Sequence, residues 1–462
     1  MEIVREDKVI SAQGNAKKQR AENLLYRAVW RWHFYAGILF APFLVILAVT
    51  GSVYLFKPQI EQVLYQSYYE VTPKDEKLAP SQQIEEAKKL YPDALVTTYR
   101  PGETANRSSE IGILSHDEGF TVFVNPYTGK SIGVLKDKDR IMDKIEEIHG
   151  ELMAGTLGDR IVELASCWAI VLSVTGLFLW LPRKENRIAG VLLPRFSKGR
   201  KILRRDLHVV PAFWVTTGML FLIFSGLPWS GFWGENFQSL TTNSGAGYPP
   251  SIWTGNTPTS TVKTKDIADV PWAAENLKVP KSDVNGLVPL SINNVVDIAN
   301  REGMHPSYKI IIPNEKKGVY TLSAFPPKAQ DEATIHIDQY SGAVLADYRY
   351  DHYGFIGKLI ALGITLHKGT QFGFFNQLIS LVICLGIIFI SISGLYLWIK
   401  RKPKKGMGAP KAPSIRIMKI FLIVLITLGI IFPLVGLSLI FVWLMDWLII
   451  QKIPSVKKFM NA

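Results

Sequence analysis

Long apolar blocks alternate with polar segments along the chain. Four blocks, roughly residues 34–56, 161–181, 209–232 and 375–399, each have about the 20 residues that a helix needs to cross a hydrocarbon core of ~30 Å. A fifth apolar stretch, 420–450, contains Pro433 and Gly436, so it predicts either one kinked span or a hairpin. The pattern predicts an α-helical membrane protein with four core transmembrane helices and a C-terminal hydrophobic helix or hairpin.

Basic residues concentrate in the short segments that flank these blocks. Residues 1–31, 182–206 and 400–419 hold 24 of the 52 Lys and Arg residues but only six acids. This asymmetry follows the positive-inside rule and predicts a cytoplasmic N-terminus. A nucleic-acid-binding protein would instead place its basic residues on a folded face with interleaved aromatic residues. The net charge of +13 therefore indicates contact with membrane lipid and no nucleic-acid partner.

The two long segments between the spans predict extracytoplasmic α+β domains. In the first, a helix is expected over 80–91 and strands over 95–99, 110–114 and 119–124; in the second, a helix over 292–299 and strands over 308–312, 319–324 and 334–337. Asn125…Thr128-Gly129 and Asp338…Ser341-Gly342 predict tight turns at matching places. The predicted parts are 1–56 (cytoplasmic N-terminus and first span), 57–148 (first outer domain), 149–232 (second span, basic loop, third span), 233–355 (second outer domain), 356–399 (fourth span) and 400–462 (basic loop and C-terminal span or hairpin).

The spans also predict an internal two-fold repeat. His33 and His208 each precede a Thr-Gly or Ser-Gly pair whose glycine follows after 18 residues, namely Gly51 and Gly226. His149 and His367 each precede such a pair with a spacing of 27 residues, ending at Gly176 and Gly394. Both copies start and return on the cytoplasmic side, so a pseudo-two-fold axis along the membrane normal is expected.

Four histidines are the candidate functional residues of this repeat. His33 and His208 start spans that enter from the cytoplasm, whereas His149 and His367 precede spans that enter from outside. Facing imidazoles can ligate a haem iron on both axial sides, so same-depth pairs predict two haems, one at each side of the bilayer. The alternative from the residues alone is a set of polar rings at the interface. The two levels lie too far apart for one metal site.

The remaining histidines and the cysteines carry less information. We expect His116, His305 and His336 at the surface of the outer domains. His352 has no counterpart in the first half and is either a spare ligand or part of a substrate surface. The two cysteines, Cys167 and Cys384, each lie inside a predicted span and are expected to serve packing.

Several runs of residues resemble the PepSY-associated transmembrane family of iron-regulated bacterial membrane proteins. They are Leu366-His367-Lys368-Gly369, Ser393-Gly394-Leu395-Tyr396-Leu397-Trp398, Trp32-His33 with Thr50-Gly51, and Asp206-Leu207-His208. The outer segments are similar to PepSY domains through the two predicted turns, and the resemblance covers roughly residues 25–400. Pro211 and Ala212 stand where the family has a glycine after the third-span histidine.

The resemblance implies a specific activity. Members of this family include ferric-siderophore reductases of the bacterial cytoplasmic membrane, in which span histidines bind two b-type haems. Carried over to this chain, the axial ligands would be His33, His149, His208 and His367. Electrons from an unidentified donor would reduce a ferric siderophore or another Fe(III) chelate on the outer side.

Two other classes of function stay open at this stage. The outer domains resemble domains associated with protease inhibition, so the chain could be a haem-free binding or regulatory membrane protein. It could also transport a siderophore or peptide. The spans carry few charged residues, of which Asp446 is the clearest, whereas proton-coupled carriers usually need buried ionisable groups.

Overall fold

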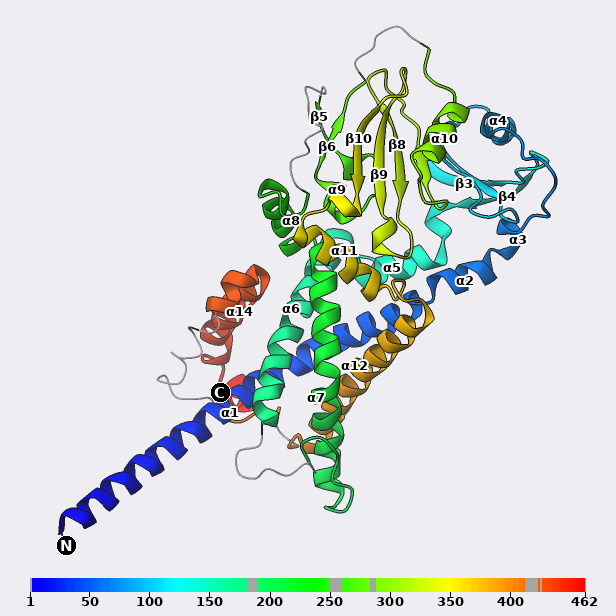
Figure 1. Cartoon of the computed structure of the whole chain (residues 1–462). Helices are drawn as coiled ribbons and strands as arrows, with labels where there is room; N and C mark the ends of the chain where they lie inside the picture. The colour runs from blue at the N-terminus through cyan, green and yellow to red at the C-terminus, as the bar shows by residue number, and fades with distance from the viewer. Residues whose placement is uncertain are drawn as a thin grey trace. The chain divides into compact units, whose positions relative to one another are not determined.

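A computed structural model of the chain describes residues 2–181, 190–248, 259–282, 288–404, 406–411, 423 and 426–461. The chain divides into two compact units (Figure 1). The membrane unit comprises Met1–Ser52, His149–Trp233 and Leu381–Ala462. The sheet unit comprises Val53–Ile148 and Gly234–Ser380.

Five helices of the described residues are long and apolar enough to cross a membrane. In hydrocarbon every backbone N–H and C=O must be bonded internally, which a continuous helix achieves. The apolar helices run over Leu24–Tyr54, Gly155–Trp180, Arg200–Trp229, Phe374–Arg401 and Pro433–Ile450. They belong to α1 (Glu2–Tyr54), α6 (Gly155–Trp180), α7 (Arg200–Gly226) with η2 (Leu227–Trp229), α12 (Phe374–Arg401) and α14 (Pro433–Met445) with η6 (Asp446–Ile450). The four predicted core spans are confirmed, and the protein is a multi-pass membrane protein.

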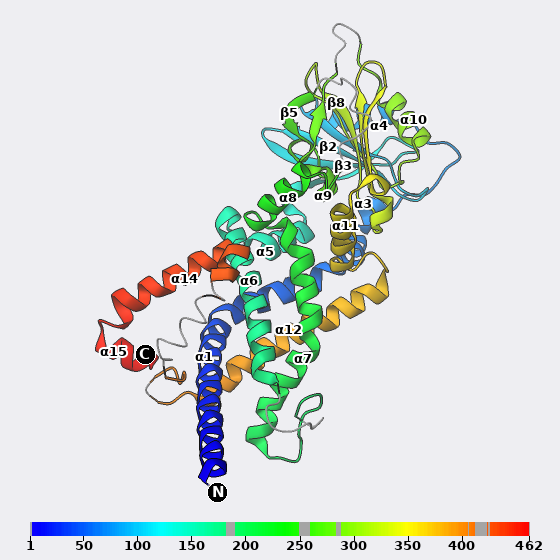
Figure 2. The same ribbon diagram turned by 60° about the vertical axis from the view of Figure 1, so that its left-hand side comes forward.

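Glycines and small side chains let the helices of the membrane unit approach closely. α6 and α7 lie side by side in both views (Figures 1 and 2). Between α7 and α12 the contact is reciprocal: Ile383 packs on Gly218, and Val215 packs on Gly386, so that a Cβ on either glycine would overlap its neighbour. Small residues at such crossings provide the van der Waals contact that drives helix association in lipid.

The C-terminal apolar stretch turns sharply at Phe432. Its backbone leaves the helical region (φ −124°, ψ 85°), and Pro433 is the first residue of α14. An ideal Cβ on Gly436 would lie 3.0 Å from the Cα of Gly429, so the two backbones meet across the bend. The two alternatives predicted for this stretch, a kinked span and a hairpin, both place a break at Pro433 and Gly436.

The end of the chain returns to the beginning of the first span. After α14, helix α15 (Pro454–Met460) places Met460 O where the Tyr35 hydroxyl donates to it (2.7 Å). Met407 N, just after α12, donates to Phe459 O (2.9 Å). The residues before and after the last apolar stretch therefore lie together, which favours the hairpin. Residues 412–422, 424 and 425 of that stretch lie outside the described part of the chain.

The sheet unit is built around an eight-stranded antiparallel sheet with the order β10-β9-β8-β7-β1-β2-β3-β4. Helices α4 (Pro80–Leu90) and α10 (Ile292–Arg301) pack against one face of it (Figures 1 and 2). The strands are β1 (Leu95–Arg100), β2 (Ser109–Ser115), β3 (Glu118–Val124), β4 (Ser131–Lys136), β7 (Lys309–Ile311), β8 (Val319–Ala324), β9 (Ala333–Asp338) and β10 (Val344–Arg349). All predicted helices and strands of this unit are confirmed within a residue or two; β4 and β10 were not predicted.

Strands β1 and β7 join the two segments for which the sequence predicts separate domains. Tyr99 pairs with Ile310, and Ile312 N donates to Thr97 O (2.9 Å). Each segment contributes four strands to this sheet, and these four strands form one half of it. The pairing of β1 with β7 removes the exposed edge that each half would otherwise present. The two halves consequently share one sheet and one apolar core.

Both predicted turns are confirmed by their glycines. Gly129 (φ +71°) donates its N–H to Asn125 O (2.9 Å), and Gly342 (φ +75°) donates to Asp338 O (3.1 Å). Positive φ is accessible to glycine at little cost. The remaining elements are α2 (Lys57–Leu64), α3 (Gln66–Tyr69), α5 (Ile141–Glu151), α8 (Trp233–Asn243), α9 (Trp272–Glu275), α11 (Phe355–His367), the hairpin strands β5 (Thr259–Lys263) and β6 (Lys278–Pro280), and the short turns η1 (Asp137–Asp139), η3 (Thr264–Asp266), η4 (Ala329–Asp331) and η5 (Tyr350–His352).

Candidate functional site

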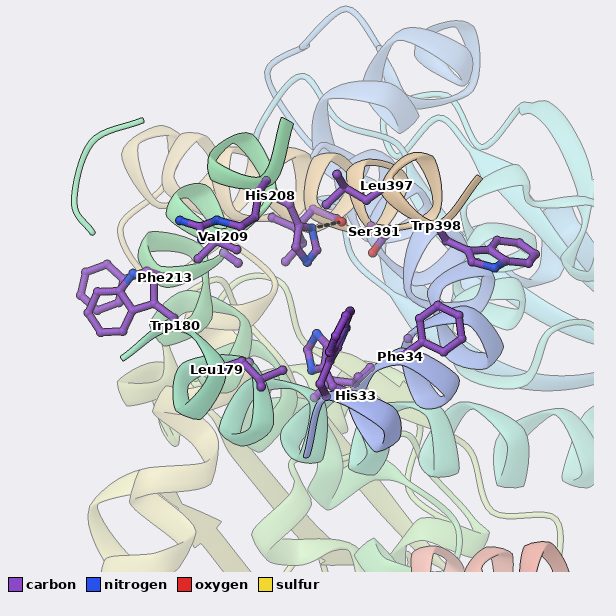
Figure 3. A pocket seen from close by; sticks show the side chains of 18 of the residues that line it. His33, Phe34, Leu179, Trp180, His208, Val209, Phe213, Ser391, Leu397 and Trp398 are labelled. Atoms are coloured by element: carbon purple, nitrogen blue, oxygen red, sulfur yellow. Dashed lines mark hydrogen bonds between the residues drawn. The ribbon is translucent and has the colours of Figure 1, made fainter. Parts of the chain in front are cut away.

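The membrane unit contains a partly open cavity of about 1220 Å³, lined by α1, α6, α7, α12 and the segments that follow α6 and α12. His33 of α1 and His208 of α7 line it, and their rings point toward each other across it (Figure 3). Most of the wall is apolar or aromatic, including Phe34, Trp180 and Trp398. Ligand sites in proteins typically have volumes of about 300–1,000 Å³ and combine apolar walls with few polar groups. The volume of the cavity is sufficient for a small-molecule cofactor.

The His33 ring is held by a hydroxyl group from α6. Its Nδ1 lies 2.9 Å from Thr175 Oγ1. Because the Thr175 hydroxyl donates its own hydrogen to Val171 O (2.7 Å), it accepts the one from His33 Nδ1. The neutral ring then carries its lone pair on Nε2. That is the protonation pattern a metal-ligating imidazole needs.

The His208 ring is held in the same way by α12. Its Nδ1 lies 3.0 Å from Ile390 O and 3.0 Å from Ser393 Oγ. A carbonyl oxygen can only accept, so Nδ1 is the donor and Nε2 again carries the lone pair. The absence of a glycine at Pro211 and Ala212 does not disturb this seat, since the support comes from another helix.

Each of these rings lies so close to a glycine that an added Cβ would make an unusually tight contact with it. An ideal Cβ on Gly176 would be 3.2 Å from His33 Cε1, and one on Gly394 would be 3.1 Å from His208 Cε1. Thr175-Gly176 and Ser393-Gly394, two of the pairs found by sequence spacing, are therefore histidine seats. Each supports a histidine from another helix and not the histidine with which the 27-residue spacing associates it.

The predicted outer histidines are located in different units. His149 belongs to the membrane unit, where its Nδ1 lies 2.9 Å from Thr50 Oγ1 and a Cβ on Gly51 would be 3.3 Å from its Cε1. Thr50 donates its hydroxyl hydrogen to Ile46 O (2.8 Å), so His149 has the same tautomer as His33 and His208. His367 ends α11 in the sheet unit. Pairing of His149 with His367 stays a prediction.

The other histidines differ in their surroundings. His352 is exposed on η5, and His116 lies at positive φ (50°) in the turn between β2 and β3. The expectation that His336 lies at the surface is wrong, because it has no exposed area. It sits on β9 within the sheet, packs edge-on against Tyr348, and its Nδ1 is 2.9 Å from Thr321 Oγ1. Burial lowers the pKa of His336 to about 3.

A buried carboxyl group lies in the same unit, directly before β9. Glu332 is 2% exposed, and neither carboxylate oxygen has a hydrogen-bond partner among the described residues. Burial raises the pKa of Glu332 to about 8, against the opposing charge of Lys368. The pKa of the nearby Tyr353 hydroxyl is also raised, chiefly by burial and then by Glu332. Glu332 is therefore largely protonated at neutral pH.

The described residues do not contain a cluster of three or more His, Cys, Asp or Glu side chains that could hold a metal ion. His33 and His208 could fill only two coordination positions, so a metal between them would need its other ligands from a bound group. A porphyrin would supply these ligands, and His33 and His208 would then hold its metal ion. Both cysteines are buried free thiols, as expected of packing residues.

Apolar membrane-crossing helices and an antiparallel β-sheet define the class of the protein as a multi-pass membrane protein with a folded sheet region. The chain matches the model of the PepSY-associated TM region over residues 30–401, which is most of its length. It belongs to this family, as the histidine and Ser-Gly runs of the sequence indicate. A search of the curated proteins finds no match.

Proposed function

We propose that the protein carries electrons across the bacterial cytoplasmic membrane through two b-type haems and reduces ferric chelates on the outer side. The observation that supports this most directly is the pair of facing imidazoles, His33 and His208, across an apolar cavity (Figure 3). Each ring donates through Nδ1 and presents Nε2 as the lone-pair nitrogen. Bis-imidazole ligation of haem iron requires this arrangement.

The residues present fit such a group. Thr175 and Ser393 fix the tautomer and rotation of the two ligand rings, and Gly176 and Gly394 leave room for the rings against the backbone. Most of the wall is apolar, and the polarity around a haem tunes its redox potential. When bound, haem supplies reversible one-electron transfer, and the protein supplies position and electrostatics.

On the outer side, His149 and His367 would hold the second haem, and the sheet unit would form the surface for the substrate. The four-strand halves on either side of the β1–β7 pair would be two PepSY domains that arose from an internal duplication. The substrate is an Fe(III) chelate, such as a ferric siderophore. One electron converts Fe(III) to Fe(II), which hard oxygen ligands bind less tightly, so iron is released. The N-terminus would be cytoplasmic.

The first test is the dithionite-reduced minus oxidised absorbance spectrum of the detergent-purified full-length protein, with haem quantified per chain. We expect sharp low-spin b-type bands and about two haems per chain. His367→Ala should remove one haem and leave the other. In proteoliposomes reduced from inside, an external ferric hydroxamate should be reduced only when haem is present.

Other results would favour the other classes of function. Purified protein without haem, after expression with added haem, would overturn the proposal and favour a binding or regulatory role of the sheet unit. Uptake of the intact chelate into vesicles without any change of iron oxidation state would favour a transporter. Loss of neither haem in His367→Ala would overturn the ligand assignment.

A further inference from the structure

The wall of the cavity is asymmetric in charge. Five cationic residues line it, and among the described residues that line it none is Asp or Glu. All five lie between α6 and α7, near the start of α7, or at and just after the end of α12. They are Arg195, Lys198, Arg205, Arg401 and Lys402. The cavity therefore combines an apolar interior with a cationic end, which suits an amphipathic ligand with anionic groups at one edge.

Two of these cations are fixed by a buried carboxylate. Asp206 has no exposed area. It accepts from Arg195 at Nε (2.7 Å), Nη2 (2.8 Å) and the backbone N (3.1 Å). It also accepts from Arg205 at Nη2 (3.0 Å) and Nε (3.3 Å). The paired bonds to Arg195 have the two-pronged geometry that holds a guanidinium in one plane.

This arrangement leaves binding capacity on both arginines. A guanidinium has five N–H donors, and the side-chain bonds to Asp206 use two on each arginine. The remaining donors belong to side chains that line the cavity. Arginine N–H groups bind carboxylates with short, charge-assisted hydrogen bonds. Asp206, two residues before His208, thus orients two arginines that can bind an anion.

We propose that Arg195 and Arg205, positioned by Asp206, bind the carboxylate groups of the tetrapyrrole held between His33 and His208. This inference rests on the proposed function and adds an orientation to it: the carboxylate edge of the haem faces the basic segments. The cations also stabilise the reduced haem, because they offset the negative charge that the added electron brings. Asp206 acts as a positioning residue.

The test compares two ligands that differ only in these carboxylates, haem b and its dimethyl ester. Both are titrated into haem-depleted full-length protein in detergent. In the wild-type protein we expect the site between His33 and His208 to bind haem b about tenfold or more tightly than the ester. In the double variant R195Q/R205Q the two affinities should become equal. Binding of the ester then serves as the check that the variant is folded.

A matched control removes the same net charge from the start of α7. Arg200 and Lys201 begin α7, are exposed and do not line the cavity. R200Q/K201Q should keep the preference for haem b. The midpoint potential of the haem, measured by spectroelectrochemistry, should fall in R195Q/R205Q and stay unchanged in the control.

Asp206→Asn separates positioning from net charge. If only charge mattered, removal of an anion would tighten carboxylate binding. If Asp206 orients the arginines, D206N should weaken the binding of haem b and leave the ester unaffected. Tighter binding of haem b in D206N would overturn the positioning role.

Three results would overturn the proposal. Equal affinities of the wild-type protein for haem b and the ester would show that the carboxylates are not recognised, while the proposed function stands. R195Q/R205Q could keep the preference for haem b but lose the binding of added phosphatidylglycerol. That result would show that the arginines bind a lipid headgroup. Failure of the wild-type protein to bind either haem would overturn the proposed function as well.

Discussion

Replacement of Thr175 by valine tests the histidine seat with the smallest change of volume. The substitution keeps the shape of the side chain and removes the hydroxyl that accepts from His33 Nδ1 at 2.9 Å. It removes the side-chain acceptor of a part-buried N–H, and an unsatisfied N–H costs about 1–3 kcal/mol. Loss of a partner that orients a metal-ligating histidine typically lowers affinity about 10- to 100-fold.

The assay is the rate of haem loss from the purified full-length protein to an excess of haem acceptor, followed by absorbance. We expect one of two haems to leave about 10- to 100-fold faster in Thr175→Val. The other haem serves as an internal standard. Thr175→Ser retains the hydroxyl and should behave like the wild-type protein.

Thr216 provides a matched control. It lines the same cavity, and its hydroxyl donates only to Ala212 O (2.6 Å) in its own helix among the described contacts. Thr216→Val should leave both haems in place. Equal rates in the two valine variants would refute the seat, and a failure of Thr175→Ser to restore retention would show that packing, not the hydrogen bond, holds His33.

Three further predictions concern packing, pH and backbone conformation. Gly176→Ala should displace the His33 ring and reduce haem content, because its Cβ would lie 3.2 Å from Cε1; an unchanged haem content would contradict this. Glu332 has a raised folded pKa of about 8, so its contribution to stability is present below about pH 4 and is lost as the pH rises to 8, by up to about 4 kcal/mol. Denaturant unfolding at about pH 6.5 and pH 8, where the slope of Glu332 is unopposed, should show part of this fall, and Glu332→Gln should flatten it; an unchanged slope would refute the protonated state. Gly342→Ala should lower the free energy of unfolding by about 1 kcal/mol, since φ is +75° there, and an unchanged melting temperature would contradict the turn.

Burial of His336 works in the opposite direction to Glu332. Its folded pKa is about 3, so its contribution to stability is present above its unfolded value of about 6.5 and is lost as the pH falls toward 3. With respect to these two groups, the sheet unit is most stable between about pH 4.5 and 6.5, where their opposing slopes cancel.

Local patterns in the sequence determined most of the secondary structure. The apolar blocks predicted the spans because the thickness of the hydrocarbon core fixes how many residues a helix needs. The turns at Gly129 and Gly342 were readable because positive φ selects glycine. His33 and His208 could be proposed as partners because the predicted repeat would place them at one depth, and the structure brings both to one cavity.

Only the tertiary structure decided which groups meet. Sequence spacing associated His33 with Gly51, which follows it on the same helix, but helix packing seats His33 against Gly176 and His149 against Gly51. The pairing of β1 with β7 likewise joins segments that are more than a hundred residues apart. The burial of His336 depends on the strands packed around it. Spacing along a chain fixes the face and depth of a residue within its own element. Which neighbour it touches depends on how separate elements cross, and that is set by packing of side chains from distant parts of the sequence.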